Sequence, residues 1–186
     1  WGSVTIGYGT TGGLEQAPLV IRNHAKLGCK VIWFPAFDSL YCNRGKRGFS
    51  ILDDSGYLKA EAVEILEIAK EYNIVVCKGH MSFEETDALF TKAREIGIDK
   101  LVNTHPYSDT WGFFTEDQIM HLADLGVYTE LVFGSLMPRL GSMDPADYVD
   151  LVHKIGADRM IMSTDWAQCM DPSPADGMRF FVGTML

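Results

Sequence analysis

Four glycines recur along the chain and constrain its fold more than any other feature. Each ends a segment with helical periodicity, and each is followed within a few residues by an almost uniformly apolar run; they are Gly28, Gly97, Gly126 and Gly156. A glycine just past a helix commonly takes the left-handed conformation that ends it. Helices alternating with uniformly apolar strands, in units of roughly thirty residues, are typical of a parallel sheet covered by helices. The sequence therefore predicts an α/β fold built of βα units.

Six strands follow from this pattern, with helices between them. The expected strands are 4–6, 30–37, 74–78, 100–104, 127–133 and 159–163, and the expected helices are 18–27, 59–72, 82–96, 115–125, 144–155 and 177–186. A closed (β/α)8 barrel has eight units and about 250 residues, whereas a doubly wound sheet is complete with about six strands. The start at Trp1 and the short last helix favour the barrel. We expect residues 1–186 to form one partial domain, an incomplete (β/α)8 TIM barrel with six βα units.

Composition narrows the class of partner. The 186 residues carry sixteen basic and twenty-five acidic side chains, a net charge of −9. This balance argues against nucleic acid or an anionic membrane surface as the main partner, and no apolar run approaches the ~20 residues of a membrane span. The four cysteines form no CxxC pair and no signal peptide is visible, so a cytoplasmic protein is expected. A small-molecule substrate is the expected partner, and a homo-oligomer is compatible with these features.

Chemically active side chains recur at the ends of three expected strands. IVVCKGH ends on His80, KLVNTHP carries His105, and RMIMSTD ends on Asp165. Functional residues of α/β folds gather at the carboxyl ends of parallel strands, so we expect these three to meet. Imidazole and carboxylate suit a divalent metal, zinc first, with manganese or iron as alternatives. Such an ion lowers the pKa of bound water to ~7, and Asp165 would accept the proton.

Three further residues are candidates for the same site. Glu130 and Asp38 lie near the ends of other expected strands, and Lys78 precedes His80 by two residues. Lys78 would therefore point to the same side as His80 if the strand stays extended. The remaining histidines, His24, His121 and His153, fall within helices, where packing or surface positions are expected.

The longest expected loop, 38–58, carries a basic cluster in an otherwise acidic chain. Arg44, Lys46 and Arg47 form it, and they either contact an anionic group of the substrate, act as a lid or are simply solvated. An aromatic group follows His105 and either walls an apolar pocket or caps the barrel; it consists of Trp111, Phe113 and Phe114.

A glycine run near the start offers an alternative function. Gly7 to Gly12 follows a strand and precedes a helix, which formally fits a dinucleotide fingerprint, with Asp38 as the ribose-binding acid of an oxidoreductase. The expected helix starts at Pro18, five residues after Gly13. A dinucleotide site needs the helix to open within the glycines, so a plain glycine-rich loop is favoured.

The order of the strand-end residues resembles that of the amidohydrolase superfamily of metal-dependent hydrolases. The segments GGLEQA, VIWFPAFDS, KGHMSFEE, NTHP and STDWAQ are similar to an uncharacterised amidohydrolase-like family over almost the whole chain. The resemblance implies that the strands are numbers three to eight of the barrel. His80 then lies on strand five, His105 on strand six and Asp165 on strand eight, as metal ligands of a hydrolase.

Two features depart from that family pattern. The HxH pair of strand one would lie upstream of Trp1, and strand four, in KVIWFPAFDS, has no lysine or glutamate to bridge two metals. A mononuclear site, or one that uses Glu130, is expected instead. The sequence thus predicts a metal-dependent hydrolase acting on a carbonyl or phosphoryl substrate, with Asp165 and His105 as catalytic residues. A metal-dependent lyase or decarboxylase on the same scaffold is the alternative within this class.

Overall fold

A six-stranded parallel sheet forms the centre of the molecule. The computed structural model describes residues 2–108, 112–137, 143–167, 169 and 171–186. The strands of this sheet are β1 (Gly2–Thr5), β2 (Cys29–Trp33), β3 (Val75–Cys77), β4 (Leu101–Thr104), β7 (Tyr128–Val132) and β8 (Met160–Ser163). Each pairs in parallel with the next, in the order β1-β2-β3-β4-β7-β8. The six predicted strands are therefore confirmed.

The order of the strands distinguishes the two architectures considered from the sequence. A doubly wound sheet reverses its direction at a switch point, whereas here spatial order follows chain order throughout. Such one-directional winding is that of a barrel wall. Within the described residues β1 and β8 each pair with one strand only, so the sheet is not closed. The fold is consistent with an incomplete barrel.

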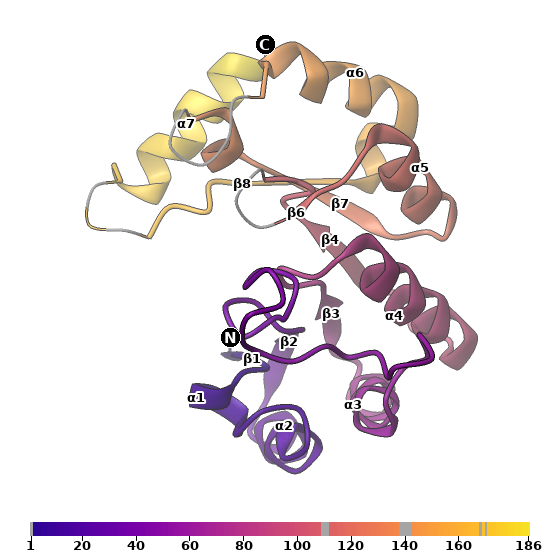
Figure 1. Ribbon diagram of the computed structural model, residues 1–186. Coiled ribbons are helices and arrows are strands. Elements are labelled where there is room, and N and C mark those ends of the chain that lie inside the picture. Colours follow the sequence, from indigo (N-terminus) through magenta and orange to yellow (C-terminus); the bar gives the residue numbers. More distant parts are fainter. Residues whose placement is uncertain (1, 109–111, 138–142, 168, 170) are drawn as a thin grey trace.

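Helices cover one face of the sheet (Figure 1). They are α1 (Tyr8–Thr11), α2 (Ala17–Lys26), α3 (Ala60–Glu71), α4 (Phe83–Ile96), α5 (Glu116–Asp124), α6 (Pro145–Ile155) and α7 (Pro174–Met185). From α2 onward each helix contacts the next, so they form one layer around the strands. Between this layer and the sheet lies the core, in which the strand residues Ile32, Val76 and Leu131 are fully buried. Within the described residues, no helix combines the length and apolar character of a membrane span.

The local signals at the helix ends are those expected from the sequence. The four glycines that follow helices all have positive φ, at 92°, 85°, 81° and 98°. At the start of α4, Ser82 and Glu85 form both bonds of a capping box, and Thr115 and Gln118 do the same for α5. Each box satisfies two backbone N–H groups that the first helical turn would otherwise leave unpaired.

Several boundaries and small elements differ from the sequence expectation. Strand β2 ends at Trp33 instead of Phe37, because Pro35 lacks the N–H that would continue the ladder. Helix α7 begins at Pro174 instead of Gly177, because the Ser173 side chain accepts from the Asp176 amide and caps an earlier turn. The glycine run contains the four-residue helix α1. A short antiparallel pair, β5 (Tyr107–Ser108) with β6 (Gly112–Phe113), follows β4, and 3-10 turns occupy Phe133–Leu136 and Ala157–Arg159.

Candidate functional site

One cavity of about 280 Å³ lies at the carboxyl ends of the parallel strands. Each strand of the sheet, or the loop that directly follows it, contributes at least one residue to its wall. The lining residues are Thr5, Trp33, Ala36, Phe37, His80, Thr104, His105, Glu130, Val132, Ser163 and Asp165. The structure thus brings together four of the predicted site residues, namely the two histidines, Glu130 and Asp165. Parallel strands end at the same edge of a sheet, which is why residues so far apart in sequence meet here.

His80 reaches the cavity because the residue before it is glycine. A Cβ atom on Gly79 would lie 2.1 Å from the Pro35 carbonyl oxygen, so no other residue allows this close approach between the ends of β3 and β2. The approach is secured by a bond of 2.9 Å from the His80 amide to that oxygen. The ring of His80 lies 5.1 Å from that of His105, centroid to centroid.

His105 and Asp165 have an unusual backbone conformation. Their φ angles are 35° and 54°, in the left-handed region that residues with a Cβ atom rarely occupy. Such strain costs on the order of 1–3 kcal/mol and clusters at functional sites. At His105 the conformation is secured by the amide, which donates to the Glu130 carbonyl at 3.1 Å. The strain turns both side chains out of the strand direction at the edge of the sheet.

Burial determines the protonation of the site. Desolvation, followed by the charge of Lys78, lowers the pKa of His80 to about 4. The pKa of His105 lies well below its usual value, through burial first and then through Lys78 and His80. Burial, and then the charges of Glu130 and Asp171, raises the pKa of Asp165 to about 6. At neutral pH the two imidazoles are therefore neutral, with lone pairs available to a cation, and Asp165 is an anion.

Three buried side-chain atoms of residues that line the cavity lack a hydrogen-bond partner in the described structure. They are Nδ1 of His105, Oε2 of Glu130 and Oγ1 of Thr104. Leaving such groups unsatisfied costs about 1–3 kcal/mol each, so a site that holds them without protein partners is suited to a further group. An imidazole nitrogen and a carboxylate oxygen are ligands for a divalent metal.

The described residues do not form a complete metal-binding group. Within them, no three His, Cys, Asp or Glu side chains lie close enough together to hold a metal ion. The four residues therefore surround the cavity without converging on one point. The donor chemistry fits a divalent ion, whereas the geometry provides only part of a ligand set.

Lys78 is not among the residues that line the cavity. Strand β3 ends at Cys77, so the extended backbone on which the sequence expectation depended does not continue to His80. The Lys78 amine is fully buried, 4.5 Å from the centroid of the Phe114 ring and 3.4 Å from the Gly79 carbonyl oxygen. Burial lowers its pKa to about 7, partly offset by Glu130. Lys78 acts on the site through its charge, without touching the cavity.

The aromatic group after β4 is divided between two environments. Phe114 is 1 % exposed and packs against Lys78 and Phe83, whereas Phe113 is 47 % exposed. Trp111 lies outside the described residues. Neither Phe113 nor Phe114 lines the cavity, so Phe114 belongs to the packing around the site.

Asp38 and the glycine run interact with each other instead of with the site. The Asp38 carboxylate accepts from the Tyr8 amide at 2.8 Å and does not line the cavity. Other amides of the run also donate within the protein: Gly7 to the Thr11 hydroxyl, and Thr10, Thr11 and Gly13 to the Gly7 carbonyl. These bonds occupy the amides that a pyrophosphate would need.

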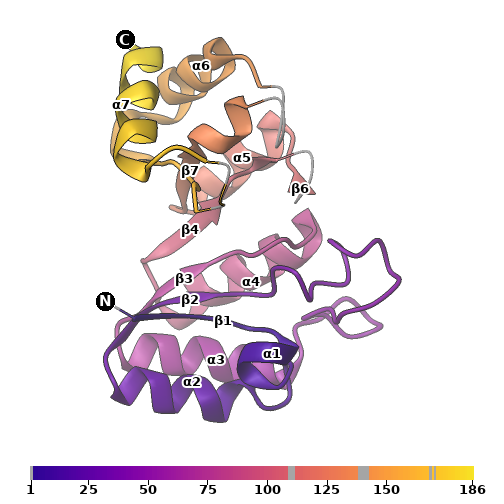
Figure 2. The same cartoon turned by 90° about the vertical axis from the view of Figure 1, so that its left-hand side faces the viewer.

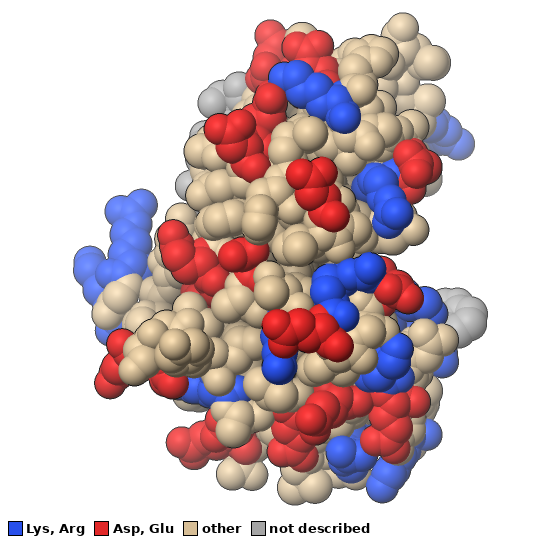
Figure 3. All heavy atoms as spheres, turned by 90° about the vertical axis from the view of Figure 1, so that its right-hand side faces the viewer, with Lys and Arg blue, Asp and Glu red and all other residues tan. Residues whose placement is uncertain are grey.

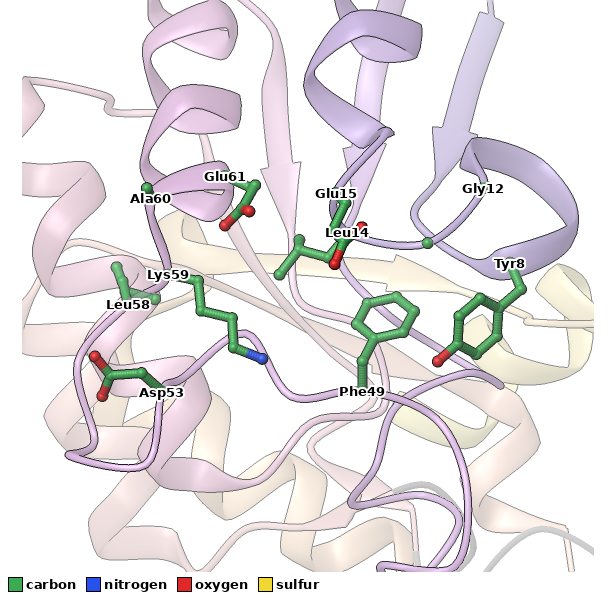
Figure 4. Close-up of a pocket in the computed structure, with 11 residues that line it drawn as sticks. Tyr8, Gly12, Leu14, Glu15, Phe49, Asp53, Leu58, Lys59, Ala60 and Glu61 are labelled. Atoms are coloured by element: carbon green, nitrogen blue, oxygen red, sulfur yellow. The ribbon is translucent and has the colours of Figure 1, made fainter.

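The space beside the glycine run is acidic (Figure 4). A cavity of about 620 Å³ there is lined by Tyr8, Gly12, Gly13, Leu14, Glu15, Phe49, Asp53, Leu58, Lys59, Ala60 and Glu61. Three of these residues are carboxylates, and the single cation, Lys59, donates to the Ser50 carbonyl at 2.9 Å. Phosphate groups would be repelled by this lining. The geometry therefore argues against the dinucleotide interpretation.

Loop 38–58 brings one unpredicted residue to the site. The Cys42 sulfur lies 3.9 Å from Nδ1 of His80. No pattern in the sequence relates two residues this far apart, and only the folded loop reveals the contact. The basic cluster Arg44, Lys46 and Arg47 follows Cys42 directly and is exposed to solvent.

Comparison with known proteins supports the fold. A model of the family DUF6282, described as a family of unknown function, matches residues 1–130. No curated protein matches the chain. Among solved structures, an amidohydrolase from Pseudomonas aeruginosa is similar at a TM-score of 0.61 and 12% identity, over 86% of this chain and 49% of that one. A prolidase complexed with N-methylphosphonate-L-proline is similar at a TM-score of 0.53 and 12% identity, over 93% of this chain and 43% of that one.

An uncharacterised protein is similar to the same degree, at a TM-score of 0.54 and 14% identity, over 93% of this chain and 43% of that one. The chain thus spans less than half the length of each of these structures. At such low identity the likeness concerns the fold alone, which is amidohydrolase-like.

Proposed function

We propose, for a chain that belongs to the DUF6282 family of unknown function, the activity of a metal-dependent hydrolase. His80, His105 and Asp165 are the proposed ligands of a divalent cation, with Glu130 as a further ligand and other groups completing the set. These side chains do not converge in the described structure, so they would have to move closer together to bind the ion. Zinc is the first choice because it binds imidazole and carboxylate alike, and manganese or iron are alternatives. The amidohydrolase and prolidase among the structural neighbours agree with this class of reaction.

The observation that carries the proposal is the presence, among the unpartnered buried atoms of the cavity wall, of two that are common metal ligands. Nδ1 of His105 and Oε2 of Glu130 have no hydrogen-bond partner in the described structure, and both residues line the cavity that contains His80 and Asp165. Nothing else in the described molecule combines buried, unpaired metal-binding atoms with a cavity at the strand ends.

The residues of the chain have distinct tasks in such a reaction. When bound, a divalent ion lowers the pKa of water to about 7 and polarises a carbonyl or phosphoryl oxygen. Asp165 accepts a proton at its carboxylate, which is unprotonated at neutral pH. His105 and His80, neutral at that pH, orient the cation or the substrate oxygen. Trp33, Phe37 and Val132 supply the apolar part of the cavity wall beside these groups.

Metal analysis of the purified protein tests the proposal. Zinc, manganese and iron are measured by mass spectrometry in the wild type, in His105→Ala and in Asp165→Asn, with His24→Ala on helix α2 as the control. We expect both site variants to lose most of the metal and the control to retain it. Wild-type metal content in both site variants would refute the ligand assignment.

The same preparations separate hydrolysis from the lyase alternative. A panel of amide, ester and phosphoester substrates is compared with a panel of 2-oxo and aromatic carboxylic acids, and release of carbon dioxide is measured. Turnover confined to the second panel would replace the hydrolase by a decarboxylase on the same residues.

A further inference from the structure

The loop that follows β2 is ordered by its own hydrogen bonds and packs against the site. The Leu40 amide donates to the Phe49 carbonyl, and the Phe49 amide donates to the Asp38 carbonyl, each at 2.9 Å. Inside the loop the Asn43 side chain donates to two carbonyl oxygens, those of Phe37 and Ser39. Figure 2 shows the loop projecting beyond the end of β2. These bonds hold the backbone of the loop in a defined conformation.

The base of the loop touches His80. The ring of Phe37 lies 5.3 Å from that of His80 in an edge-to-face arrangement, and the Cys42 sulfur lies 3.9 Å from Nδ1 of the same ring. Arg44, Lys46 and Arg47 follow within five positions of Cys42. The charge of Arg47 extends to Cys42, where it opposes the rise in the pKa of the thiol that burial causes. Arg47 donates to the Asn43 side chain at 2.7 Å, and Asn43 donates to the carbonyl oxygen of Phe37, which lines the cavity. The basic cluster therefore belongs to a loop whose base forms part of the cavity wall, and we refer to the cluster as the rim.

The three cations have no acidic partner among the residues that the structure describes. Within the described part of the chain, no carboxylate forms an ion pair with Arg44, Lys46 or Arg47; Arg47 donates to the neutral Asn43 side chain at 2.7 Å. On the face shown in Figure 3 most basic side chains are interspersed with acidic ones, whereas one basic group projects at the left edge. In a chain of net charge −9, three unpaired cations beside a cavity create a local positive potential.

The floor of the cavity would be close to neutral with a divalent cation bound. Glu130 and Asp165 supply two carboxylates there, which would balance the two positive charges of the ion. A substrate with one anionic end is therefore attracted by the rim more strongly than by the floor. It would enter with the anion at the rim and its uncharged, electrophilic portion toward His105 and Asp165.

From this arrangement we infer that Arg44, Lys46 and Arg47 bind an anionic group, a carboxylate or a phosphate, of a small-molecule substrate whose reacting centre lies at the floor of the cavity. The inference rests on the proposed function, to which it adds the substrate class. Guanidinium groups match both anions in bidentate geometry, and lysine adds a point charge.

Cys42 provides a test that needs neither metal nor turnover. Iodoacetate, an anion, and iodoacetamide, which is neutral, alkylate the same thiolate. The fraction of Cys42 that is deprotonated affects both rates equally, so the ratio of the two rates reports the local electrostatic potential. We expect the iodoacetate/iodoacetamide ratio at Cys42 to exceed that at the exposed Cys169 severalfold at low salt. It should fall to the Cys169 ratio in Arg44→Gln/Lys46→Gln/Arg47→Gln and in about 0.5 M NaCl, where the Debye length is short.

Two further variants control the measurement. Lys26→Gln/Lys30→Gln/Lys100→Gln removes the same charge from exposed positions elsewhere and should leave the Cys42 ratio unchanged. Arg44→Gln/Lys46→Gln retains the bond from Arg47 to Asn43 and should lower the ratio partially if the triple variant fails to fold. Equal ratios at Cys42 and Cys169 in the wild type would overturn the inference, whatever the metal content of the protein.

Protection experiments identify the anion. Inorganic phosphate and succinate are titrated against the iodoacetamide reaction at Cys42, with NaCl matched in ionic strength. Saturable slowing of the alkylation by phosphate alone indicates a phosphorylated substrate. Slowing by succinate alone indicates a carboxylate, and slowing by both compounds indicates that the site accepts either anion. Absence of slowing by either, beyond that of NaCl, contradicts a binding site at the rim.

Discussion

At the scale of single residues, the backbone of His105 is the most informative feature of the site. Its φ of 35° means that an alanine there carries a Cβ penalty that glycine avoids, of about 1 kcal/mol or more. His105→Gly should therefore be more stable than His105→Ala by about that amount, although glycine usually destabilises. The free energies of unfolding of both variants, from urea titration of metal-free protein, give the comparison.

His80 is the matched control, because it is not among the residues with positive φ. There, His80→Gly should be less stable than His80→Ala by about 0.5–1 kcal/mol, which is the ordinary entropic cost of glycine. If the glycine variant is less stable than the alanine variant at both positions, the conformation of His105 is not strained.

The buried histidines also make stability depend on pH. An unfolded histidine has a pKa of about 6.5, whereas that of folded His80 is about 4 and that of His105 is also depressed. Between these values the unfolded state binds more protons, so metal-free protein loses stability as pH falls from about 7 to 5, by up to about 1.4 kcal/mol per pH unit for each histidine. Asp165, whose folded pKa is raised, acts in the opposite direction.

Comparison of variants isolates the histidine contribution. Urea unfolding in EDTA gives the free energy of unfolding at pH 7 and at pH 5. From pH 7 to pH 5 this free energy should fall less for His80→Gln than for the wild type. For His24→Gln, on the surface of α2, it should fall as much as for the wild type. An identical pH dependence in all three proteins would mean that His80 is not held neutral by burial.

At the scale of elements, Glu85 connects helix α4 to loop 38–58. Its carboxylate accepts from the Ser82 amide in the capping box and also from the Ser50 hydroxyl at 2.6 Å and the Ile51 amide at 3.2 Å. With Glu85 only 5 % exposed, Glu85→Ala leaves those donors unsatisfied and should cost about 2 kcal/mol or more. Among the described residues the Gln118 side chain bonds only within its own capping box, and Gln118→Ala should cost about 1 kcal/mol or less.

Urea midpoints of the two variants, with the m-value checked for constancy, measure this difference. Equal losses would show that the bonds from Ser50 and Ile51 contribute nothing, and that the loop is held by other contacts. A larger loss for Glu85→Ala, with faster Cys42 alkylation, would show that α4 also positions the basic rim.

The elements also show how far sequence reasoning extends. Strands, helices and capping boxes follow from local signals such as apolar runs, helix-ending glycines and the Ser82–Glu85 spacing, so they were predictable. The meeting of His80, His105 and Asp165 at one cavity followed from the common direction of parallel strands. The Cys42–His80 contact and the burial of Lys78 behind Phe114 depend on tertiary contacts and on a strand that ends one residue before Lys78, which no local pattern encodes.

At the scale of the whole molecule, the open sheet has consequences for association. In the described structure β8 pairs with β7 alone, and its residues Ile161 and Met162 are each 36 % exposed. An unpaired strand edge with exposed apolar side chains is a template for pairing with another chain. We therefore expect this 186-residue chain to self-associate as its concentration rises, by light scattering after size exclusion.

Charge on the edge strand should suppress that association. Ile161→Lys/Met162→Lys places two like charges on β8, and the repulsion between copies opposes edge-to-edge pairing. Leu27→Lys, at an 86 % exposed position beyond α2, is the control for added charge and should leave the association unchanged. If the β8 variant associates as strongly as the control, the contact between copies is formed by some surface other than this edge, and β8 is protected by the twist of the sheet.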